Sequence, residues 1–343
     1  MPGSSYGLLI GPALSTASLP RTAVLPSAGL LEIINTCGLV VMSTPLGAAS
    51  VQNCAAGSPN AFQTPASLQV PVSASADRVY YRDGDTRIRW LTPNGQTGDA
   101  ATVPGGPATI SFFSVSPDDQ RIAVVVADFS PASTINQRLY VEDLSGGGHH
   151  VDLYTTSTPK GGDGSILWPM GWHQGRLVVA VLPACGYPQE SLSPSAWHVV
   201  DASTGNRLVA ITSTCGDGIS GTLSLWPSPA GVICIDGSAS LYDWTGKRFG
   251  FSPGEGTPGY QSQLSPSGRG WFASGNGRGV VESYTHWSND GYEDLFSYAG
   301  CLWIDEDHVL TPYALVTRGT PGTPDTFVPF VQGVCAGSFP GGL

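Results

Sequence analysis

The sequence repeats a unit of two short apolar strands joined by a tight turn of four to six residues. The clearest copy runs from Phe113 to Val124 and reads FSVSPDDQRIAV, and further copies lie at 263–272 and 72–80. In its turn, Pro117 takes the second position, where the fixed φ of proline suits a type I turn. One hairpin cannot bury its apolar faces alone, so repeated hairpins must pack side by side.

Looser copies extend this repeat over most of the chain. They lie at 34–41, 170–178, 226–233 and 303–310. A second hairpin follows most of the first ones, with clear examples at 139–154, 197–210 and 240–249. Seven hairpin pairs at this spacing are typical of a propeller of four-stranded blades. We therefore predict an all-β fold, a β-propeller with seven four-stranded blades; six blades with an elaborated N-terminal segment is the alternative.

The repeats leave no clear boundary inside the 343 residues, so we expect one propeller domain over 1–343. The last copy is short of residues for its fourth strand near 326–331. An N-terminal strand at 5–10 is expected to close this last blade. Closure matters because an open ring leaves unpaired strand edges.

The stretch SPDDQRIA at 116–123 and the turns of the type Val-x-Asp-x-x-x-Gly carry a family resemblance. They resemble the WD40-like, TolB-like and YVTN-type β-propeller repeat superfamily. This resemblance implies a propeller fold and a tendency to bind partners. It implies no particular reaction.

Composition and net charge limit the classes of molecule that this chain can bind. Charged residues make up 12% of the chain, the formal net charge is −11, and Lys160 and Lys247 are its lysines. A nucleic acid is excluded as a partner, because affinity for phosphates comes from Lys and Arg. No run of 18 apolar residues occurs, so we expect no transmembrane segment. The first residues lack a basic stretch followed by an apolar one, so we expect a signal or lipoprotein leader to be absent from this chain.

Seven cysteines in an acidic, lysine-poor chain indicate three disulfides and a secreted, periplasmic or cell-surface protein. Cys234 alternates like a buried strand residue and is expected to be a free thiol. The strand map suggests these pairs: Cys37 with Cys54, Cys185 with Cys215, and Cys301 with Cys335. Cys301 and Cys335 are not obviously at the same end of a blade. Reduced core cysteines in a cytosolic protein are the alternative.

Three long loops are expected on one face of the propeller, at 128–137, 183–196 and 317–325. Loops on a rigid scaffold often carry function, although tolerated surface insertions would look the same. The second of these loops contains Tyr187 and Glu190. A further segment mixes aromatic rings with carboxylates, as ligand sites do, but also reads as an Asn-Asp-Gly hairpin turn. The candidate ligand-binding residues are Tyr187, Glu190, His286, Trp287, Asp290 and Tyr292.

The sequence contains no metal or cofactor motif, so we expect no cofactor. The acidic groups at 83–85, 118–119 and 305–307 leave one structural calcium as an alternative, although none has EF-hand spacing. All three lie at expected turns, where Asp is common. The adjacent His149 and His150 are expected in a solvated turn.

The leading hypothesis is an extracellular or cell-surface binding module that presents a loop-rich face to a protein or glycan ligand. A propeller hydrolase acting on extracellular glycans is one alternative, because paired catalytic carboxylates from different blades leave no local motif. A self-associating structural subunit of a surface assembly is the other. No catalytic residue can be named, which favours a protein that is not an enzyme.

Overall fold

The structure is a computed structural model that describes part of the chain. The described residues are 6–10, 30–35, 40–45, 72–75, 77–92, 94–160, 164–183, 193–214, 221–224, 226–235, 239–252, 263–268, 270–272, 282–286, 292–295, 302–310, 314–317, 326–329, 334–335 and 343. In these ranges the chain forms strands β1 to β28 and no α-helix. No helix there has the length and apolarity that a membrane crossing needs.

The strands form seven four-stranded antiparallel sheets, and six of these use four consecutive strands each. The first three of the six contain β4 (Val72–Ala74), β5 (Val79–Asp83), β6 (Arg87–Leu91) and β7 (Thr97–Thr102); β8 (Thr109–Val115), β9 (Arg121–Asp128), β10 (Thr134–Asp143) and β11 (Val151–Pro159); and β12 (Ser165–His173), β13 (Arg176–Pro183), β14 (Ala196–Val200) and β15 (Arg207–Thr212). The other three contain β16 (Thr222–Leu223), β17 (Val232–Ile235), β18 (Ala239–Tyr242) and β19 (Arg248–Ser252); β20 (Gln263–Leu264), β21 (Gly270–Phe272), β22 (Glu282–His286) and β23 (Tyr292–Leu295); and β24 (Leu302–Trp303), β25 (His308–Leu310), β26 (Ala314–Thr317) and β27 (Thr326–Pro329).

The seventh sheet joins strands from both ends of the chain. Its order is β28 (Val334–Cys335), β1 (Tyr6–Ile10), β2 (Leu30–Asn35) and β3 (Val40–Pro45). The N-terminal strand therefore pairs with β2 and β28, and not with the strand at 326–329 as the sequence suggested. The reason is that β26 forms at 314–317, which leaves β27 as the fourth strand of its own sheet. The hairpin at 34–41 consequently supplies the third and fourth strands of a sheet, not the first two.

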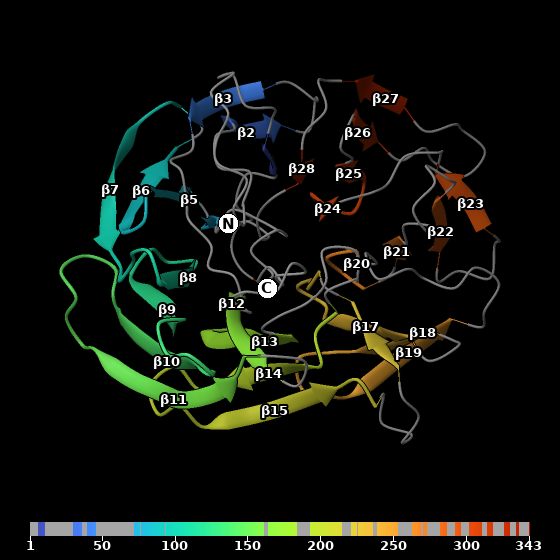
Figure 1. Ribbon diagram of the computed structural model, residues 1–343. Coiled ribbons are helices and arrows are strands. Elements are labelled where there is room, and N and C mark those ends of the chain that lie inside the picture. The colour runs from blue at the N-terminus through green and yellow to red at the C-terminus, as the bar shows by residue number, and fades with distance from the viewer. Residues whose placement is uncertain are drawn as a thin grey trace.

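Figure 1 shows the sheets arranged around a centre, with strands such as β8, β12, β20 and β24 near it and β7, β11, β15 and β19 at the rim. The labelled C-terminal end, Leu343, lies near this centre. Radially arranged, four-stranded antiparallel sheets are the architecture of a β-propeller. The prediction of an all-β propeller fold is confirmed.

The burial of each strand follows its place in the sheet. In β9, the second strand of its sheet, five of the eight residues are buried and the other three are half-buried, because neighbouring sheets cover both of its faces. In β11, at the rim, exposed and half-buried residues alternate, and Thr158 is its buried residue. Inner strands therefore read as apolar runs in the sequence, while rim strands read as polar ones.

Buried tryptophans join neighbouring sheets. Trp172, Trp197 and Trp303 are almost fully buried. Their indole N–H groups donate to backbone carbonyls of the next or preceding sheet, those of Ser114 at 3.3 Å, Ser224 at 3.2 Å and Gln263 at 3.2 Å. Each ring adds a large apolar surface to a seam between sheets and satisfies its one polar group there.

A buried glutamine also links two sheets. Gln137 on β10 is 2% exposed, and its amide donates to the Ser165 carbonyl at 2.5 Å and accepts from the Leu167 N–H at 2.9 Å. This residue was expected in a long loop from 128 to 137. The structure instead starts β10 at Thr134, because Ile135 and Gln137 are buried in alternation with exposed Asn136. The connection between β9 and β10 is correspondingly short.

Five of the rim strands carry a β-bulge at the same place in their sheet. In each, two consecutive residues of the adjacent strand pair with two rim-strand residues that are not consecutive. One extra, unpaired residue lies between them on the rim strand. From the registers, the extra residues are Val41, Ala100, Leu153, Leu208 and Phe249. Such a bulge bends the strand locally and increases its twist.

Candidate binding groove between two sheets

At two seams between sheets, a glycine of the rim hairpin turn packs directly on the rim strand of the preceding sheet. Gly205 has φ 73°, and a methyl group placed on it would lie 2.7 Å from the carbonyl oxygen of Leu153. Gly246 has φ 80°, and a methyl group there would lie 2.9 Å from Cγ1 of Val209. These close approaches need glycine, because a side chain at either position would clash with the preceding sheet.

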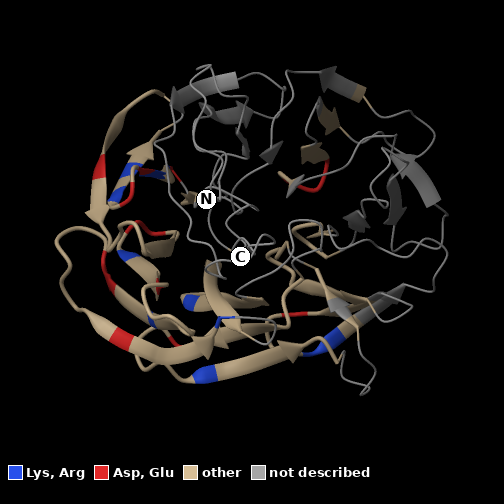
Figure 2. Cartoon of the chain, viewed as in Figure 1, with Lys and Arg blue, Asp and Glu red and all other residues tan. Residues whose placement is uncertain are grey.

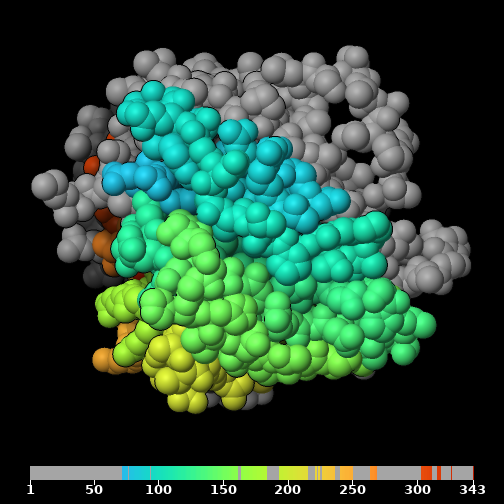
Figure 3. Space-filling view, turned by 90° about the vertical axis from the view of Figure 1, so that its left-hand side faces the viewer, coloured from blue at the N-terminus to red at the C-terminus, as the bar shows by residue number. Residues whose placement is uncertain are grey.

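The corresponding seam between the β4–β7 and β8–β11 sheets is open. Gly146, the matching glycine of the β10–β11 turn, has φ 88°, and a methyl group on it would meet no atom within 4 Å. A groove of about 440 Å³ lies here. It is lined by Arg87, Asp99, Ala100, Ala101, Thr102, Glu142, Leu144, Gly146 and Gly147. Figure 3 looks onto the side of the molecule that carries β7 and the β10–β11 hairpin, with the first in cyan and the second in green.

Small residues on both walls explain the open space. The bulge residue of β7 is Ala100, where the rim strands β11, β15 and β19 have Leu153, Leu208 and Phe249. On the other wall, the turn contains the run Gly146–Gly148, which supplies no side chain. The floor is formed by Leu144, whose side chain is 6% exposed and belongs to the apolar cluster of this seam.

The strand wall of the groove carries paired charges. The Arg87 guanidinium donates to the Asp83 carboxylate, so the charge of this arginine is already matched. Arg89 lies between two carboxylates, with Nε 3.3 Å from Oδ1 of Asp99 and Nη1 3.9 Å from Oδ2 of Asp83. The Asp99 side chain is nevertheless 71% exposed and faces the groove.

The turn wall carries histidines beside carboxylates. Nδ1 of His150 lies 2.7 Å from Oε2 of Glu142, and its Nε2 lies 3.4 Å from Oδ1 of Asp152. The bond to Glu142 is the main cause that raises the pKa of His150 above its ordinary value. His149 is more exposed, with Nδ1 2.8 Å from Oδ2 of Asp143. Figure 2 shows acidic positions of this hairpin on the rim. Both histidines lie in a solvated turn, as the sequence suggested.

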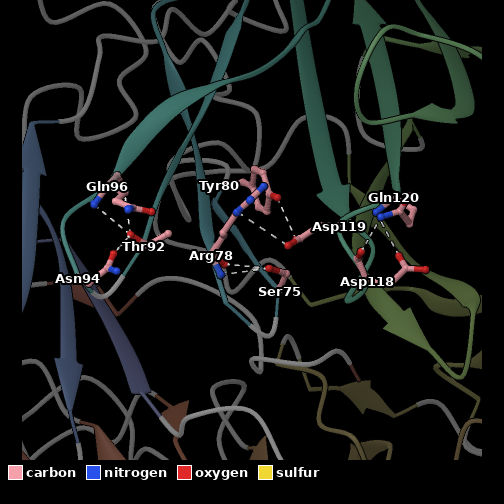
Figure 4. A network of polar contacts seen from close by, with 9 residues as sticks. All are labelled: Ser75, Arg78, Tyr80, Thr92, Asn94, Gln96, Asp118, Asp119 and Gln120. Atoms are coloured by element: carbon pink, nitrogen blue, oxygen red, sulfur yellow. Dashed lines mark hydrogen bonds and ion pairs between the residues drawn. The ribbon is translucent and has the colours of Figure 1, made fainter. Parts of the chain in front are cut away.

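A polar network beside the groove fixes the two sheets relative to each other (Figure 4). The Tyr80 hydroxyl of β5 donates to Oδ1 of Asp119 at 2.9 Å, and Arg78 Nε lies 4.0 Å from Oδ2 of the same carboxylate. The Arg78 guanidinium also lies over the Trp90 ring, 4.8 Å from its centroid. Burial is the main cause that raises the pKa of Tyr80, so the phenol stays a donor at neutral pH.

Arg82 is buried deeper in the same seam. Its side chain is 1% exposed, its guanidinium donates to the Ser111 carbonyl, and its Nε has no hydrogen-bond partner. Burial lowers the pKa of Arg82 to about 10, which still leaves it charged at neutral pH. No carboxylate of the described residues lies within ion-pair distance of it. The seam therefore contains a buried positive charge compensated by a backbone carbonyl.

The ligand-binding residues suggested by the sequence are only partly placed. His286 ends β22 and Tyr292 begins β23, and these strands pair with Thr285 opposite Tyr292. The two residues therefore flank the connection of a rim hairpin, as the hairpin interpretation requires. Their side chains, together with Tyr187, Glu190, Trp287 and Asp290, lie outside the described residues.

The cysteines give one correction. Cys234 on β17 is fully buried but forms a disulfide, so it is not the free thiol expected from its alternation. Since one sulfur forms one such bond, the three suggested pairs cannot all form. Cys335 lies on β28, and the side chains of the six candidates lie outside the described residues: Cys37, Cys54, Cys185, Cys215, Cys301 and Cys335. Their pairing stays a prediction.

The acidic groups considered for calcium serve local structure. Oδ1 of Asp118 accepts from the Ser116 hydroxyl at 2.5 Å, and Oδ1 of Asp305 accepts from the Asp307 N–H at 2.9 Å. Asp83 pairs with Arg87. In the described ranges, no three His, Cys, Asp or Glu side chains gather as metal ligands would. The structural calcium finds no site among these residues.

Sequence reasoning missed the groove, because it forms where residues 40 or more positions apart meet. Its signals were present as the pair Ala100-Ala101 on a rim strand and the run Gly146–Gly148 in a rim turn. Neither pattern indicates a site by itself, because small residues are common in strands and turns. Only the contrast with the filled seams at Gly205 and Gly246 gives them meaning.

Comparisons with known proteins add the following. No protein-family model matches the chain, and no curated protein is similar to it. Among solved structures, it is similar to a protein from Lactobacillus plantarum, with 17% identity, a TM-score of 0.47, and 96% of this chain and 98% of that chain covered. A putative 6-phosphogluconolactonase from Bacteroides uniformis has 13% identity, a TM-score of 0.46 and the same coverage. TolB from Acinetobacter baumannii has 14% identity, a TM-score of 0.41, and 92% and 78% covered. At the level of fold the expected resemblance to β-propellers is confirmed by the sheets of Figure 1.

Proposed function

We propose that the protein is a binding module that holds a protein or glycan ligand, with the groove between the β4–β7 and β8–β11 sheets as its described site. The observation that carries this proposal is that one seam is open where two equivalent seams are filled. A groove of about 440 Å³ falls in the size range of ligand sites. Its walls combine apolar carbon with a few charged groups, which is the usual composition of such sites.

The scaffold behind this site is proposed to be one domain over 1–343, a closed ring of seven blades. Support comes from the sheet that combines both chain ends, in which Leu9 lies opposite Cys335 and Ile10 opposite Val334. Residues from β6, β7 and the β10–β11 hairpin would then be held at fixed distances by a continuous ring. A rigid scaffold of this kind favours binding because little conformational entropy is lost when the ligand docks.

Two of the described carboxyl groups, Asp118 and Asp201, are suited to stabilising turns and not to acid catalysis. A glycosidase acid needs a raised pKa. At Asp118, hydrogen bonds from Ser116 and Gln120 outweigh the effect of burial and lower the pKa. At Asp201, hydrogen bonds from Ser203 lower it as well. Both carboxyl groups therefore stay ionised, as residues that stabilise turns do.

An oxidising location, whether secreted, periplasmic or at the cell surface, is also part of the proposal. The disulfide of Cys234 supports it, because structural disulfides persist mainly in oxidising compartments. Non-reducing peptide mapping of protein purified from its native source tests this point. Fully reduced cysteines in that material would contradict it.

The loop-rich face remains a proposed second contact surface, with Tyr187, Glu190, His286, Trp287, Asp290 and Tyr292 as its residues. Aromatic rings there would stack on a sugar or an apolar side chain. Binding that is lost in Trp287→Ala and unchanged by substitutions in the groove would assign the ligand to this face.

The experiment for the groove uses immobilised full-length protein on two panels, one of glycans and one of random extended peptides. Thr102→Trp fills the groove from an exposed position on β7, and Thr97→Trp adds the same ring at an exposed position of that strand outside the groove. We expect saturable binding on at least one panel that Thr102→Trp abolishes and Thr97→Trp keeps. No saturable binding on either panel would overturn the proposed function, and equal effects of the two variants would overturn the site.

A further inference from the structure

We infer that the groove takes an extended segment of a protein partner that carries lysine or arginine side chains. This inference rests on the proposed function and names the class of ligand. It follows from the residue types on the two walls, from their charge, and from the strand that forms one of them.

The residue types favour a peptide over a glycan. None of the nine residues that line the groove is aromatic, and sugar recognition normally uses an aromatic face. Ala100, Ala101 and Leu144 instead offer short apolar side chains, and Gly146 and Gly147 expose their backbone. Such a surface fits the main chain and small side chains of an extended segment.

The position of β7 supports the same conclusion. It is the last strand of its sheet, and in the described chain it pairs with β6 alone. Its bulge at Ala100 interrupts any regular ladder with a further strand. The segment is therefore held by contacts between β7 and the Gly146–Gly147 turn, and not by continuous strand addition.

The charges select a basic segment. The lining residues carry one positive and two negative groups: Arg87, which is paired with Asp83, and the carboxylates of Asp99 and Glu142, which give the lining an excess of one negative charge. Arg89 compensates Asp99 from behind, at 3.3 Å, while the Asp99 side chain stays 71% exposed. Glu142 contacts His150, which carries no charge above its pKa, so the groove is negative when this histidine is neutral.

The net charge of the whole chain also favours a basic partner. Its formal net charge of −11 attracts a basic partner over a distance of about one Debye length, ~8 Å at physiological salt. Long-range attraction increases the encounter rate, while the two groove carboxylates fix the place where the cation docks. A single exposed charge pair contributes modestly, so each carboxylate should change affinity several-fold and not abolish binding.

The test uses fluorescence polarisation with a labelled peptide of alternating Lys and Ala and a twin of alternating Glu and Ala. We expect saturable binding of the Lys peptide alone. Asp99→Asn and Glu142→Gln should each weaken it about two- to fivefold, within the range measured for exposed charge pairs. Thr102→Trp should abolish it, and Thr97→Trp should leave it unchanged. Thermal melts confirm that each variant is folded.

A matched control separates the groove from the overall charge. Asp307→Asn removes the same charge from an exposed carboxylate outside the groove. Equal weakening by Asp307→Asn, or equal binding of the Glu peptide, overturns the inference. If other peptides or glycans bind in a manner sensitive to Thr102→Trp while the Lys peptide does not, the proposed function holds and this inference fails. If nothing binds on either panel, both fail.

Discussion

The Tyr80 hydroxyl and the Asp119 carboxylate meet at 2.9 Å across the seam between two sheets. Asp119 has φ 59°, in the left-handed region where the corresponding turns have Gly175 and Gly268. A residue with a side chain costs about 1–2 kcal/mol in this region. The hydrogen bond to Tyr80 and the nearby Arg78 offset that cost and tie the turn to the neighbouring sheet.

The bond across this seam should be measurable as a coupling. We expect Tyr80→Phe to lower the free energy of unfolding by about 1 kcal/mol, since one hydrogen bond is lost. Asp119→Ala should cost about 1–2 kcal/mol, because the bond is lost while the left-handed backbone remains. Urea unfolding of the two variants and the double variant should give a coupling of about 0.5–1.5 kcal/mol. Strict additivity would show that the bond does not form in solution.

Replacing Gln137 by leucine should destabilise the protein far more than replacing its neighbour Asn136. Gln137→Leu leaves the Leu167 N–H and the Ser165 carbonyl without their partners in a buried seam. We expect a loss of about 2–4 kcal/mol from these two unsatisfied groups. Asn136→Leu makes the same change at an exposed position of β10 and should stay within about 0.5 kcal/mol of the wild type. Chemical denaturation compares them, and similar losses would contradict the arrangement.

Two glycines test the difference between a filled and an open seam. Gly205→Ala and Gly146→Ala both place a side chain at positive φ, which costs about 1–2 kcal/mol. Only Gly205→Ala also brings a methyl group to 2.7 Å from the Leu153 carbonyl oxygen. We expect Gly205→Ala to be the more destabilising by about 1–3 kcal/mol, as overpacking is elsewhere. Thermal and urea unfolding measure it, and equal losses would mean that the two seams are alike.

His198 should make the protein less stable as the pH falls. Burial is the main cause that lowers its pKa to about 4, from an ordinary value near 6.5. The unfolded chain then binds more protons between these values, so stability is complete above pH 6.5 and declines as the pH falls towards 4. The loss is at most about 3 kcal/mol by the shift.

The measurement is the free energy of unfolding from pH 4 to pH 7 for His198→Gln and the wild type. The variant should show a flatter profile over this window. His149→Gln removes an imidazole that is 91% exposed and should keep the wild-type slope. An unchanged slope in His198→Gln would contradict a half-buried histidine that is neutral in the folded protein.

Arg82 should be replaceable by an apolar residue of similar length. Its buried guanidinium has one hydrogen bond and no carboxylate partner among the described residues. A methionine side chain removes the desolvation cost of a buried charge that has no ion-pair partner in the described part of the chain, and this gain offsets the loss of the donor to the Ser111 carbonyl. We therefore expect Arg82→Met to be at least as stable as the wild type by urea unfolding. A loss above about 2 kcal/mol would mean that this charge contributes to folding.

Much of the fold could be predicted from the sequence, because each hairpin has a local pattern of apolar strand residues and turn residues. The turn at Pro117 and the apolar runs beside it predicted β8 and β9, and the Asp201 and Asp243 turns predicted their rim hairpins. The sequence predicted that the N-terminal strand joins the C-terminal end of the chain, but it did not identify the partner strand, in which Cys335 lies opposite Leu9. No local pattern encodes a contact of that length.

The candidate site was less predictable for a related reason. The groove depends on small residues, and Ala100 or Gly146 attracts no attention in a sequence without its neighbour across the seam. Cys234 was misjudged in the same way: its alternation correctly predicted burial on β17, but its bonding depends on another cysteine far along the chain.

The bulges in the rim strands also limit strand pairing between two copies of this protein. An outermost strand with a regular backbone can recruit a strand from a second copy and start a fibril. Five rim strands have a bulge that interrupts their hydrogen-bond register, so a strand from a second molecule could pair with them over only a few residues. The bulge residues are Val41, Ala100, Leu153, Leu208 and Phe249. A protein made almost entirely of β-structure can thereby stay dispersed at high concentration.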